Sequence, residues 1–496
     1  SGVVSGVVSG VVSGVVSGVV SGVVSGSRNI AVIGGGVSGL TAACELSKKG
    51  YNVTLFESGD EVGGRVRVLH EGGFSFDMGP SWYWMPEIYE QVFDRFGYDI
   101  PYNLTRLDPA YRVFQKNDGG YAHFDVPGNS DDFKNWLGVG SGDMGIFFND
   151  SLAKYNRVVD DWIWRPMNSL WDLVSPSLLW DGLHYKLFGS LNKWINNTTN
   201  DTRIQMALKW PVIFIGVSPN DSPSLWSFLS YASSNTFYPD GGMTSPIITL
   251  KKIASDLGVH FRLNSEVTSL NINGNRISQV CDNSGFCWNV EGVIAAGEFH
   301  HIEQKLLPYK YRNYNAKWWN KQILSPSCLV FYLGFNTKLK GLLHHNFIFD
   351  KNLDHYINSI FGGVGGVGGV GGVGGVGGVG GDIPFYISAT SKTDLNVAPK
   401  GGETLFILIP FHFSVDDSMD TDKFRQRILN IILKKLVVMG AFGEHCGKET
   451  CNWLEYDFVN CYFNSCDFGN SLVYYSSFGP SDFKKKYNAF KGNAFG

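Results

Sequence analysis

The chain has 496 residues, a formal net charge of −4 and a charged fraction of 17%. This length allows two or three domains with a large buried core, and the near-neutral charge argues against nucleic acid as a partner. Aromatic residues make up 14% of the chain, which suits either a long apolar tunnel or a large aromatic core. We find no apolar run of about 18 residues, so no membrane-spanning helix is predicted, while a peripheral contact with a membrane surface stays open.

The chain begins with a low-complexity segment. Residues 1–26 consist mainly of a Ser-Gly-Val-Val repeat, and a Gly-Gly-Val repeat occupies residues 362–381. Neither has the patterned apolar face that a packed core needs. We read both as low-complexity inserts or linkers and assign them no chemistry.

The stretch 30–57 predicts a strand, a glycine turn, a helix and a second strand. It reads IAVIGGGVSGLTAACELSKKGYNVTLFE. The apolar run at 30–33 is typical of a strand buried on both faces. Apolar residues three positions apart from Leu40 onward predict a helix, and Lys48-Lys49-Gly50 predicts its end. The next strand ends at the acidic Glu57.

Gly34, Gly36 and Gly39 form the pattern G-x-G-x-x-G inside this unit. The first glycine permits a tight turn, the second lets a pyrophosphate approach the backbone, and the third lets the helix pack on the strand. The helix N-terminus attracts the phosphates, and Glu57 is placed to accept hydrogen bonds from a ribose diol. The sequence therefore predicts a dinucleotide site in an α/β fold.

A second glycine pair follows, Gly63-Gly64-Arg65, and then FDMGP at 76–80. Such a G-G-R after the ribose acid resembles the second fingerprint of FAD-binding flavoproteins. With both motifs in place, the chain resembles the phytoene desaturase family of carotenoid biosynthesis. Further phrases of this family follow in order over about four-fifths of the chain, at 78–93, 104–114, 213–232, 237–243, 300–308, 325–339, 391–401 and 479–496.

The resemblance implies a Rossmann-like FAD-binding domain, a mixed-sheet substrate domain and a helical cap, the architecture of flavin amine oxidases. It places Val267 beside the adenine, and we read Asp77 as structural or cofactor-supporting. No catalytic residue and no metal ligand is assigned. The predicted cofactor-binding residues are Gly34, Gly36, Gly39, Glu57, Gly63, Gly64, Arg65, Gly79, Pro80, Ser81 and Val267.

The domain prediction divides the chain at changes of pattern. Asn273-Gly274 predicts a hairpin, and strands are expected near 328–335, 384–390 and 404–411. Aromatic residues at helical spacing from Trp162 onward predict a cap, with helix packing favoured over membrane contact. The predicted parts are 27–125 and 236–305 for the FAD domain, 126–235 for the cap, 306–440 for the substrate domain, and 470–496 for a return to the FAD domain.

Eight cysteines occur, and reduced thiols in a cytoplasmic protein are the expectation. The segment 444–469 has no counterpart in the family phrases. Its four cysteines permit a zinc site, but their spacing favours an irregular insertion. These are Cys446, Cys451, Cys461 and Cys466.

The function implied by the resemblance is FAD-dependent desaturation of a linear carotene such as phytoene. Flavin takes the hydride, and a quinone or oxygen reoxidises it, at a membrane surface. His300, His301 and Glu303 follow the predicted strand at 292–299, but a structural role is the favoured interpretation for them. The family has a glycine-rich flavin segment beyond the phrase that this chain ends on, so we expect an incomplete flavin cradle.

Three alternatives remain. A carotene isomerase or ketolase of the same superfamily carries the same motifs. A flavin amine oxidase uses the same fold for another chemistry, but the phrases at 78–114 and 479–496 argue against it. The third alternative is an inactive homologue, which the repeats and the cysteine-rich segment favour.

Overall fold

A computed structural model describes most of the chain between Arg28 and Phe478. The repeats, the cysteine-rich segment 444–469 and the phrase at 479–496 lie outside the described residues, and so do the zinc and insertion hypotheses that concern them. The described residues are 28–165, 180, 182, 185, 189–322, 327–350, 353–361, 383–411, 422–442 and 472–478.

The predicted strand–turn–helix–strand unit is confirmed. β1 (Asn29–Ile33), α2 (Val37–Lys48) and β2 (Asn52–Phe56) follow one another, and the two strands pair in parallel. β9 (His260–Arg262) and β13 (Gly292–Ala295) complete a parallel sheet in the order β13-β1-β2-β9. Segments from the two predicted parts of the FAD domain therefore form one sheet.

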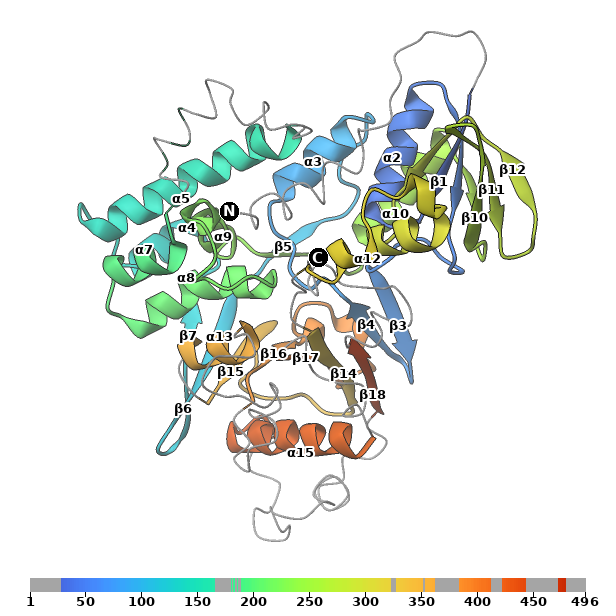
Figure 1. The fold of residues 1–496 in the computed structure, drawn as a ribbon. Coiled ribbons are helices and arrows are strands. Elements are labelled where there is room, and N and C mark those ends of the chain that lie inside the picture. Colours follow the sequence, from blue (N-terminus) through green and yellow to red (C-terminus); the bar gives the residue numbers. More distant parts are fainter. Residues whose placement is uncertain are drawn as a thin grey trace.

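Helices cover one face of this sheet and a hairpin covers the other (Figure 1). Leu40 of α2 and Ile253 of α10 (Ser245–Asp256) pack with Val32 of β1 in one apolar cluster. On the other face, Ala31 packs with Val280 of the antiparallel strands β10 (Val267–Asn273), β11 (Arg276–Asp282) and β12 (Cys287–Asn289). The predicted hairpin at Asn273-Gly274 is confirmed.

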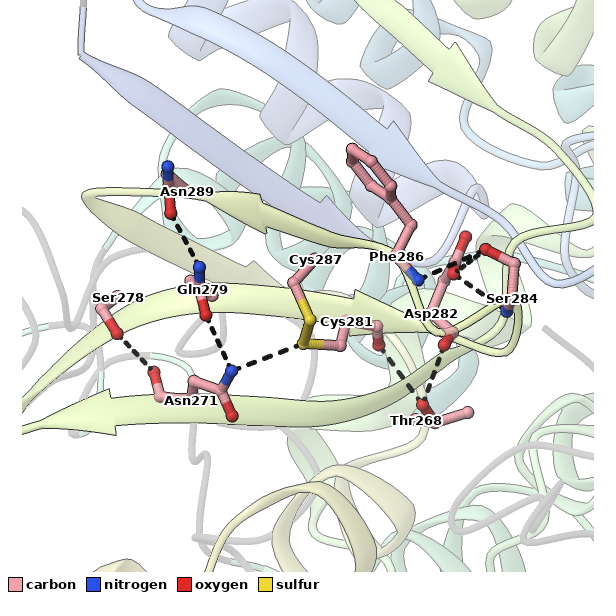
Figure 2. The surroundings of a disulfide bond; sticks show 10 residues. All are labelled: Thr268, Asn271, Ser278, Gln279, Cys281, Asp282, Ser284, Phe286, Cys287 and Asn289. Carbon is pink, nitrogen blue, oxygen red and sulfur yellow. Dashed lines mark hydrogen bonds between the residues drawn. A yellow bond between two sulfur atoms is a disulfide. The ribbon is translucent and has the colours of Figure 1, made fainter.

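The expectation of reduced thiols is wrong for one cysteine pair. Cys281 and Cys287 form a disulfide, shown in Figure 2. The register of β11 and β12 places these two residues directly opposite each other, so the turn between the strands brings the thiols together. Asn271 Nδ2 donates to Cys281 Sγ at 3.5 Å from the neighbouring strand.

A second, mixed sheet of seven strands forms the centre of the molecule, in the order β18-β14-β17-β16-β15-β6-β7. All neighbours are antiparallel except the β15–β6 pair. β6 comes from the range 27–125, so the predicted boundary at 125 does not separate the two sheets. The strands are β6 (Tyr111–Asn117), β7 (Gly120–Val126), β14 (Ser327–Phe335), β15 (His345–Phe349), β16 (Phe385–Ser388), β17 (Glu403–Phe411) and β18 (Leu472–Phe478).

Alternation along these strands separates two apolar cores. Phe331 and Ile407 point to the face covered by α15 (Asp422–Val438), where they pack with Leu429. Tyr332 and Leu408 point to the opposite face and join the core of the cap. Figure 1 shows α15 below the sheet and the cap helices on the other side.

The cap is helical where the structure describes it. Most of the aromatic pattern from Trp162 onward lies outside the described residues, including 166–179, so its interpretation as helix packing stays a prediction. Elsewhere in the cap, aromatic residues such as Phe147 and Trp210 are buried in its core. In the described residues, no helix combines the length and apolarity needed to cross a bilayer. The helices are α4 (Ser130–Trp136), α5 (Asp143–Asp160), η1 (Trp162–Trp164), α7 (Leu191–Thr198), α8 (Thr202–Phe214), η3 (Ser224–Trp226) and α9 (Ser227–Ala232), with α13 (Leu353–Phe361) facing them.

Two further antiparallel pairs form small two-stranded sheets. β3 (Arg67–Glu71) pairs with β4 (Phe74–Met78), and β5 (Leu104–Arg106) pairs with β8 (Phe237–Pro239). Phe76 of β4 packs edge-on against Tyr332 with ring centroids 5.7 Å apart. The remaining elements are α3 (Pro86–Asp94), α11 (Phe299–His301), η4 (Ile302–Leu306), η5 (Tyr309–Tyr311), α12 (Ala316–Trp319), η6 (Thr390–Lys392) and η7 (Leu395–Val397).

The contact of β4 with the large sheet is close enough to test by adding one methyl group. A Cβ atom at Gly334 would lie 2.8 Å from the buried ring of Phe74. Gly334→Ala should therefore lower the free energy of unfolding by about 1–3 kcal/mol, measured by urea denaturation. Gly140→Ala, where the added atom meets open space, is the control. Equal effects of the two substitutions would contradict the packing.

Candidate functional site

The glycine turn after β1 is closed by backbone contacts. Gly34 has φ of 104° and its N–H donates to the carbonyl of Phe56 at 2.8 Å. A Cβ atom at Gly39 would lie only 1.9 Å from the carbonyl oxygen of Gly34. The third glycine therefore lets α2 begin directly against the turn, as the fingerprint requires.

Gly36 and Gly64 bring the two glycine motifs together. A Cβ atom at Gly64, where φ is 61°, would lie 3.1 Å from the Cα of Gly36. Gly36 is the N-cap residue of α2 and supplies no side-chain cap. The first N–H groups of the helix thus point into a cradle without side chains, which fits a pyrophosphate.

Gly63 and Gly79 fold the chain around Arg65. The N–H of Gly63 donates to the carbonyl of Gly35 at 2.8 Å. Gly79 has φ of 108°, and a Cβ atom there would lie 2.4 Å from the carbonyl oxygen of Arg65. The Arg65 side chain is exposed and interacts electrostatically with Glu298, and Pro80 is half-buried.

Glu57 lies at the carboxyl end of β2, beside the glycine turn. One carboxylate oxygen accepts from the N–H of Gly35 at 2.7 Å, and the other accepts from the N–H of Gly59 at 2.9 Å. The N–H of Ser265 donates to the Glu57 carbonyl at 2.9 Å, which brings the start of β10 and Val267 near this end of the sheet. The Val267 side chain itself is buried in the core.

These predicted residues therefore lie around the carboxyl ends of β1 and β2 in the parallel sheet. Their contacts with a cofactor remain predictions. Ser81 does not lie with the other predicted cofactor-binding residues. Its hydroxyl points into the cap core and lies 3.0 Å from the Tyr386 hydroxyl.

Asp77 ties the segment FDMGP to the segment FYPDGGM. Its carboxylate accepts from the Tyr238 hydroxyl at 2.8 Å and from the Met243 N–H at 3.1 Å. Burial raises the pKa of Asp77 to about 6, although both hydrogen bonds act to lower it. The geometry agrees with a structural role for this carboxylate.

A buried polar group that the sequence did not predict lies beyond Ser81. The hydroxyl of Tyr386 is 2.6 Å from Nδ1 of His345, and the imidazole stacks on Trp82 with ring centroids 3.7 Å apart. One feature of the phrase LLHHNFIF could have indicated this group. His345, Phe347 and Phe349 occupy alternate positions of a strand, so their side chains share one face.

An apolar pocket adjoins this polar group. It lies between α8, α13 and the cap face of the large sheet, and Tyr386 belongs both to the pocket and to the polar group. The lining residues are Trp210, Ile213, Phe214, Phe347, Phe349, Leu353, Tyr356, Ile357, Ile360, Pro384, Phe385, Tyr386, Leu408 and Pro410.

The residues after β13 have structural contacts. Glu303 is fully buried and accepts from the N–H groups of Asn313 and Tyr314 and from the Trp319 indole, at 2.7, 3.0 and 3.0 Å. Burial lowers the pKa of His301. These contacts agree with the structural interpretation of this segment.

Comparison with known proteins gives relatives along nearly the whole chain. A carotenoid 3,4-desaturase of Haloarcula japonica is 28% identical, covering 94% of this chain and 88% of its own. A 4,4'-diapophytoene desaturase of Staphylococcus haemolyticus is 26% identical with the same coverage. A zeta-carotene-forming phytoene desaturase of Myxococcus xanthus is 27% identical over 81% of this chain and 76% of its own.

Family and structural comparisons agree on the fold. The family described as NAD(P)-binding Rossmann-like domain matches residues 32–98. An oxidoreductase of Methanosarcina mazei superposes with a TM-score of 0.53 at 17% identity, covering 83% of this chain and 84% of that one. A putrescine oxidase reaches 0.51 at 16% identity, covering 84% and 82%. The predicted Rossmann-like, amine oxidase-like architecture is confirmed.

The raised pKa of Asp77 makes stability depend on pH. The folded state holds the proton up to about pH 6, whereas the unfolded chain loses it near pH 4, so this group's contribution to stability falls as the pH rises between these values. Asp77→Asn keeps an acceptor for Met243 and a partner for Tyr238 but cannot ionise. Relative to the parent chain, the variant should gain about 1–3 kcal/mol between pH 4 and pH 7 in urea denaturation. Parallel pH profiles of the two proteins would contradict the raised pKa.

Proposed function

We propose that this chain, a relative of the carotenoid desaturases along nearly its whole length, is an FAD-dependent desaturase of a linear carotene such as phytoene. One observation carries the proposal. The apolar pocket and the dinucleotide cradle are joined by a single short segment, in which Gly79 packs on Arg65 and Ser81 contacts Tyr386.

FAD is the dinucleotide that we propose for the cradle. Gly36 and Gly64 leave room for a pyrophosphate, α2 supplies N–H groups, and Glu57 retains acceptor capacity beside its two backbone donors. The Gly63-Gly64-Arg65 motif favours FAD over a nicotinamide cofactor. When bound, flavin supplies a two-electron acceptor for hydride.

The substrate that suits the pocket is a long hydrocarbon. A linear carotene has no group for polar recognition, and the pocket offers almost only aromatic and aliphatic side chains. Its position over the sheet directs a bound chain along β15, from Phe349 through Phe347 toward His345. The reacting carbons would then lie at the polar end, near Ser81.

Such a substrate resides in lipid, so we propose that the protein works at a membrane surface. Ile146 of α5 and Trp180, both on the cap, are 55% and 68% exposed and support a membrane contact. A quinone or oxygen would reoxidise the flavin, since both are present at a membrane.

FAD binding can be tested with one methyl group. Gly36→Ala has an ordinary φ of −73° and a contact of 3.9 Å to Gly64, so the fold should keep its thermal midpoint. The added methyl group occupies the pyrophosphate space, and retention of FAD absorbance after desalting should fall at least about tenfold. Gly140→Ala should retain FAD like the parent chain. Equal retention by both variants would argue against this cradle.

The reaction is tested by supplying the FAD-loaded chain with phytoene in liposomes. We expect bleaching of the flavin without oxygen, and products with additional conjugated double bonds when oxygen or a quinone is present, identified by chromatography and absorption. A product with the same number of double bonds would indicate an isomerase, and an oxygenated product would indicate a ketolase. Bound FAD that is reduced by no polyene would refute the desaturase proposal.

A further inference from the structure

His345 has an unexplained nitrogen in the core. The residue is fully buried, its Nδ1 lies 2.6 Å from the Tyr386 hydroxyl, and its ring stacks on Trp82. Among the residues that the structure describes, Nε2 has no hydrogen-bond partner. A buried polar atom without a partner costs on the order of 1–3 kcal/mol, so its presence calls for a reason.

The position of His345 relates it to the pocket. Side chains at alternate positions of β15 share one face, and Phe347 and Phe349 on this face line the pocket. Phe347 pairs with Tyr386 in the sheet, and His345 pairs with Ser388. His345 therefore lies about 7 Å beyond Phe347, in line with the pocket.

One short segment links this end of the pocket to the dinucleotide cradle. The Tyr386 hydroxyl links His345 to Ser81, and Ser81 follows the Gly79 turn that packs on Arg65. A polar atom with free capacity thus lies where an apolar chain entering from the pocket would approach the cofactor.

We propose that His345 is the catalytic base of the desaturation proposed above, on which this inference rests, and that its Nε2 takes the proton that the substrate loses. When bound, oxidised flavin would accept the hydrogen of one substrate C–H bond together with both its electrons, as a hydride. The C–H bond on the neighbouring carbon then breaks, and its electron pair becomes the new C=C bond. The proton bonds to Nε2, and the imidazolium releases it to water after the product leaves.

A weak base is sufficient for this step. Burial lowers the pKa of His345 well below its usual range, and the neighbouring His344 lowers it further. A C–H bond beside a carbocation is far more acidic than an imidazolium, so even this histidine can accept the proton. Its low basicity also keeps the imidazole neutral before each turnover.

The nearest titratable groups around His345, His344 and Tyr386, are uncharged near neutral pH. His344, which burial brings to a pKa of about 3, contacts Thr393 and Tyr238 on other elements. Tyr386 of β16 has a pKa raised by burial, so it stays protonated. Asp77 accepts from the Tyr238 hydroxyl and also acts electrostatically on Tyr386, helping to raise the pKa of that hydroxyl.

The proposal fixes the tautomer of His345. A free lone pair on Nε2 requires the hydrogen on Nδ1, so Nδ1–H donates to Tyr386 and the Tyr386 hydroxyl donates to Ser81. Nitrogen-15 NMR of histidine-labelled protein tests this without any turnover, with His345→Gln identifying the resonances. A neutral ring protonated on Nδ1 is expected, and one protonated on Nε2 would overturn the proposal.

The kinetic test uses His345→Gln, His345→Asn and the matched control His344→Gln. His344 is also buried, lies next in sequence and has an Nε2 without a hydrogen-bond partner among the described residues, but its Nδ1 is bonded to Thr393 at 2.7 Å and not to Tyr386. In the FAD-loaded chain with phytoene liposomes and no oxygen, the flavin reduction rate should fall about 10²–10⁴-fold in both His345 variants. FAD retention and phytoene affinity should be unchanged, and His344→Gln should stay within about threefold of the parent rate.

The outcomes separate this proposal from the one it rests on. If the parent chain reduces its flavin with phytoene and the His345 variants do so at the same rate, His345 is not the base although the desaturase proposal stands. If the parent chain binds FAD but no polyene reduces it, both proposals fail. A loss of FAD binding or folding that is equal in His344→Gln and His345→Gln would assign His345 a structural role.

Tyr386→Phe keeps the test decisive if both His345 variants fail to fold. It preserves the ring that lines the pocket and removes only the hydroxyl that orients the imidazole. Flavin reduction should fall about tenfold with unchanged phytoene affinity, and the NMR should show a loss of the single tautomer. An unchanged tautomer and rate would overturn the proposal.

Discussion

Six residues, Phe76 to Ser81, hold the cradle, the large sheet and the cap in one arrangement. Phe76 packs on Tyr332 of the sheet, and Asp77 accepts from Tyr238 and Met243. The Gly79 backbone folds against the Arg65 carbonyl, and the Ser81 hydroxyl contacts Tyr386. The residues of this segment contact different parts of the molecule. A shift of the segment would therefore move the pocket relative to the cradle. In the proposed function, the spacing between cofactor and substrate would therefore depend on these contacts.

The parts of the site that were predictable from the sequence are those made by local geometry. A glycine turn, a helix start and an acidic strand end lie within 30–57, and their roles follow from backbone sterics alone. The same holds for the hairpin at Asn273-Gly274. Beyond local geometry, the sequence predicted only what an apolar pattern indicates. It indicated the positions of strands β14, β16 and β17 of the large sheet, but not their partners.

The buried group around His345 was not predictable in this way. Ser81 and Tyr386 are 305 positions apart, and no local pattern reports that their hydroxyls meet. The disulfide is a similar case. Cys281 and Cys287 are brought together by the register of β11 and β12, whereas reduced thiols in a cytoplasmic protein are the expectation from the sequence. The disulfide is decided by strand register, which the sequence constrains only through face alternation, and the Ser81–Tyr386 contact is decided by the tertiary path of the segment after β4.

The two faces of the large sheet differ, because one is closed by a helix and the other bears the apolar pocket and the buried polar group. Its α15 face is closed by aliphatic side chains such as Ile407 and Leu429, so it supplies stability without requiring any opening. The cap face instead meets helices through aromatic rings such as Trp210, which leave a pocket between them. Under the proposed function, an apolar lining that excludes water would leave a positive charge on a bound polyene unquenched and would keep the basicity of His345 low. The proposed base, a neutral imidazole close to an apolar pocket, would thus match a reaction whose intermediate, and not its substrate, carries the acidic proton.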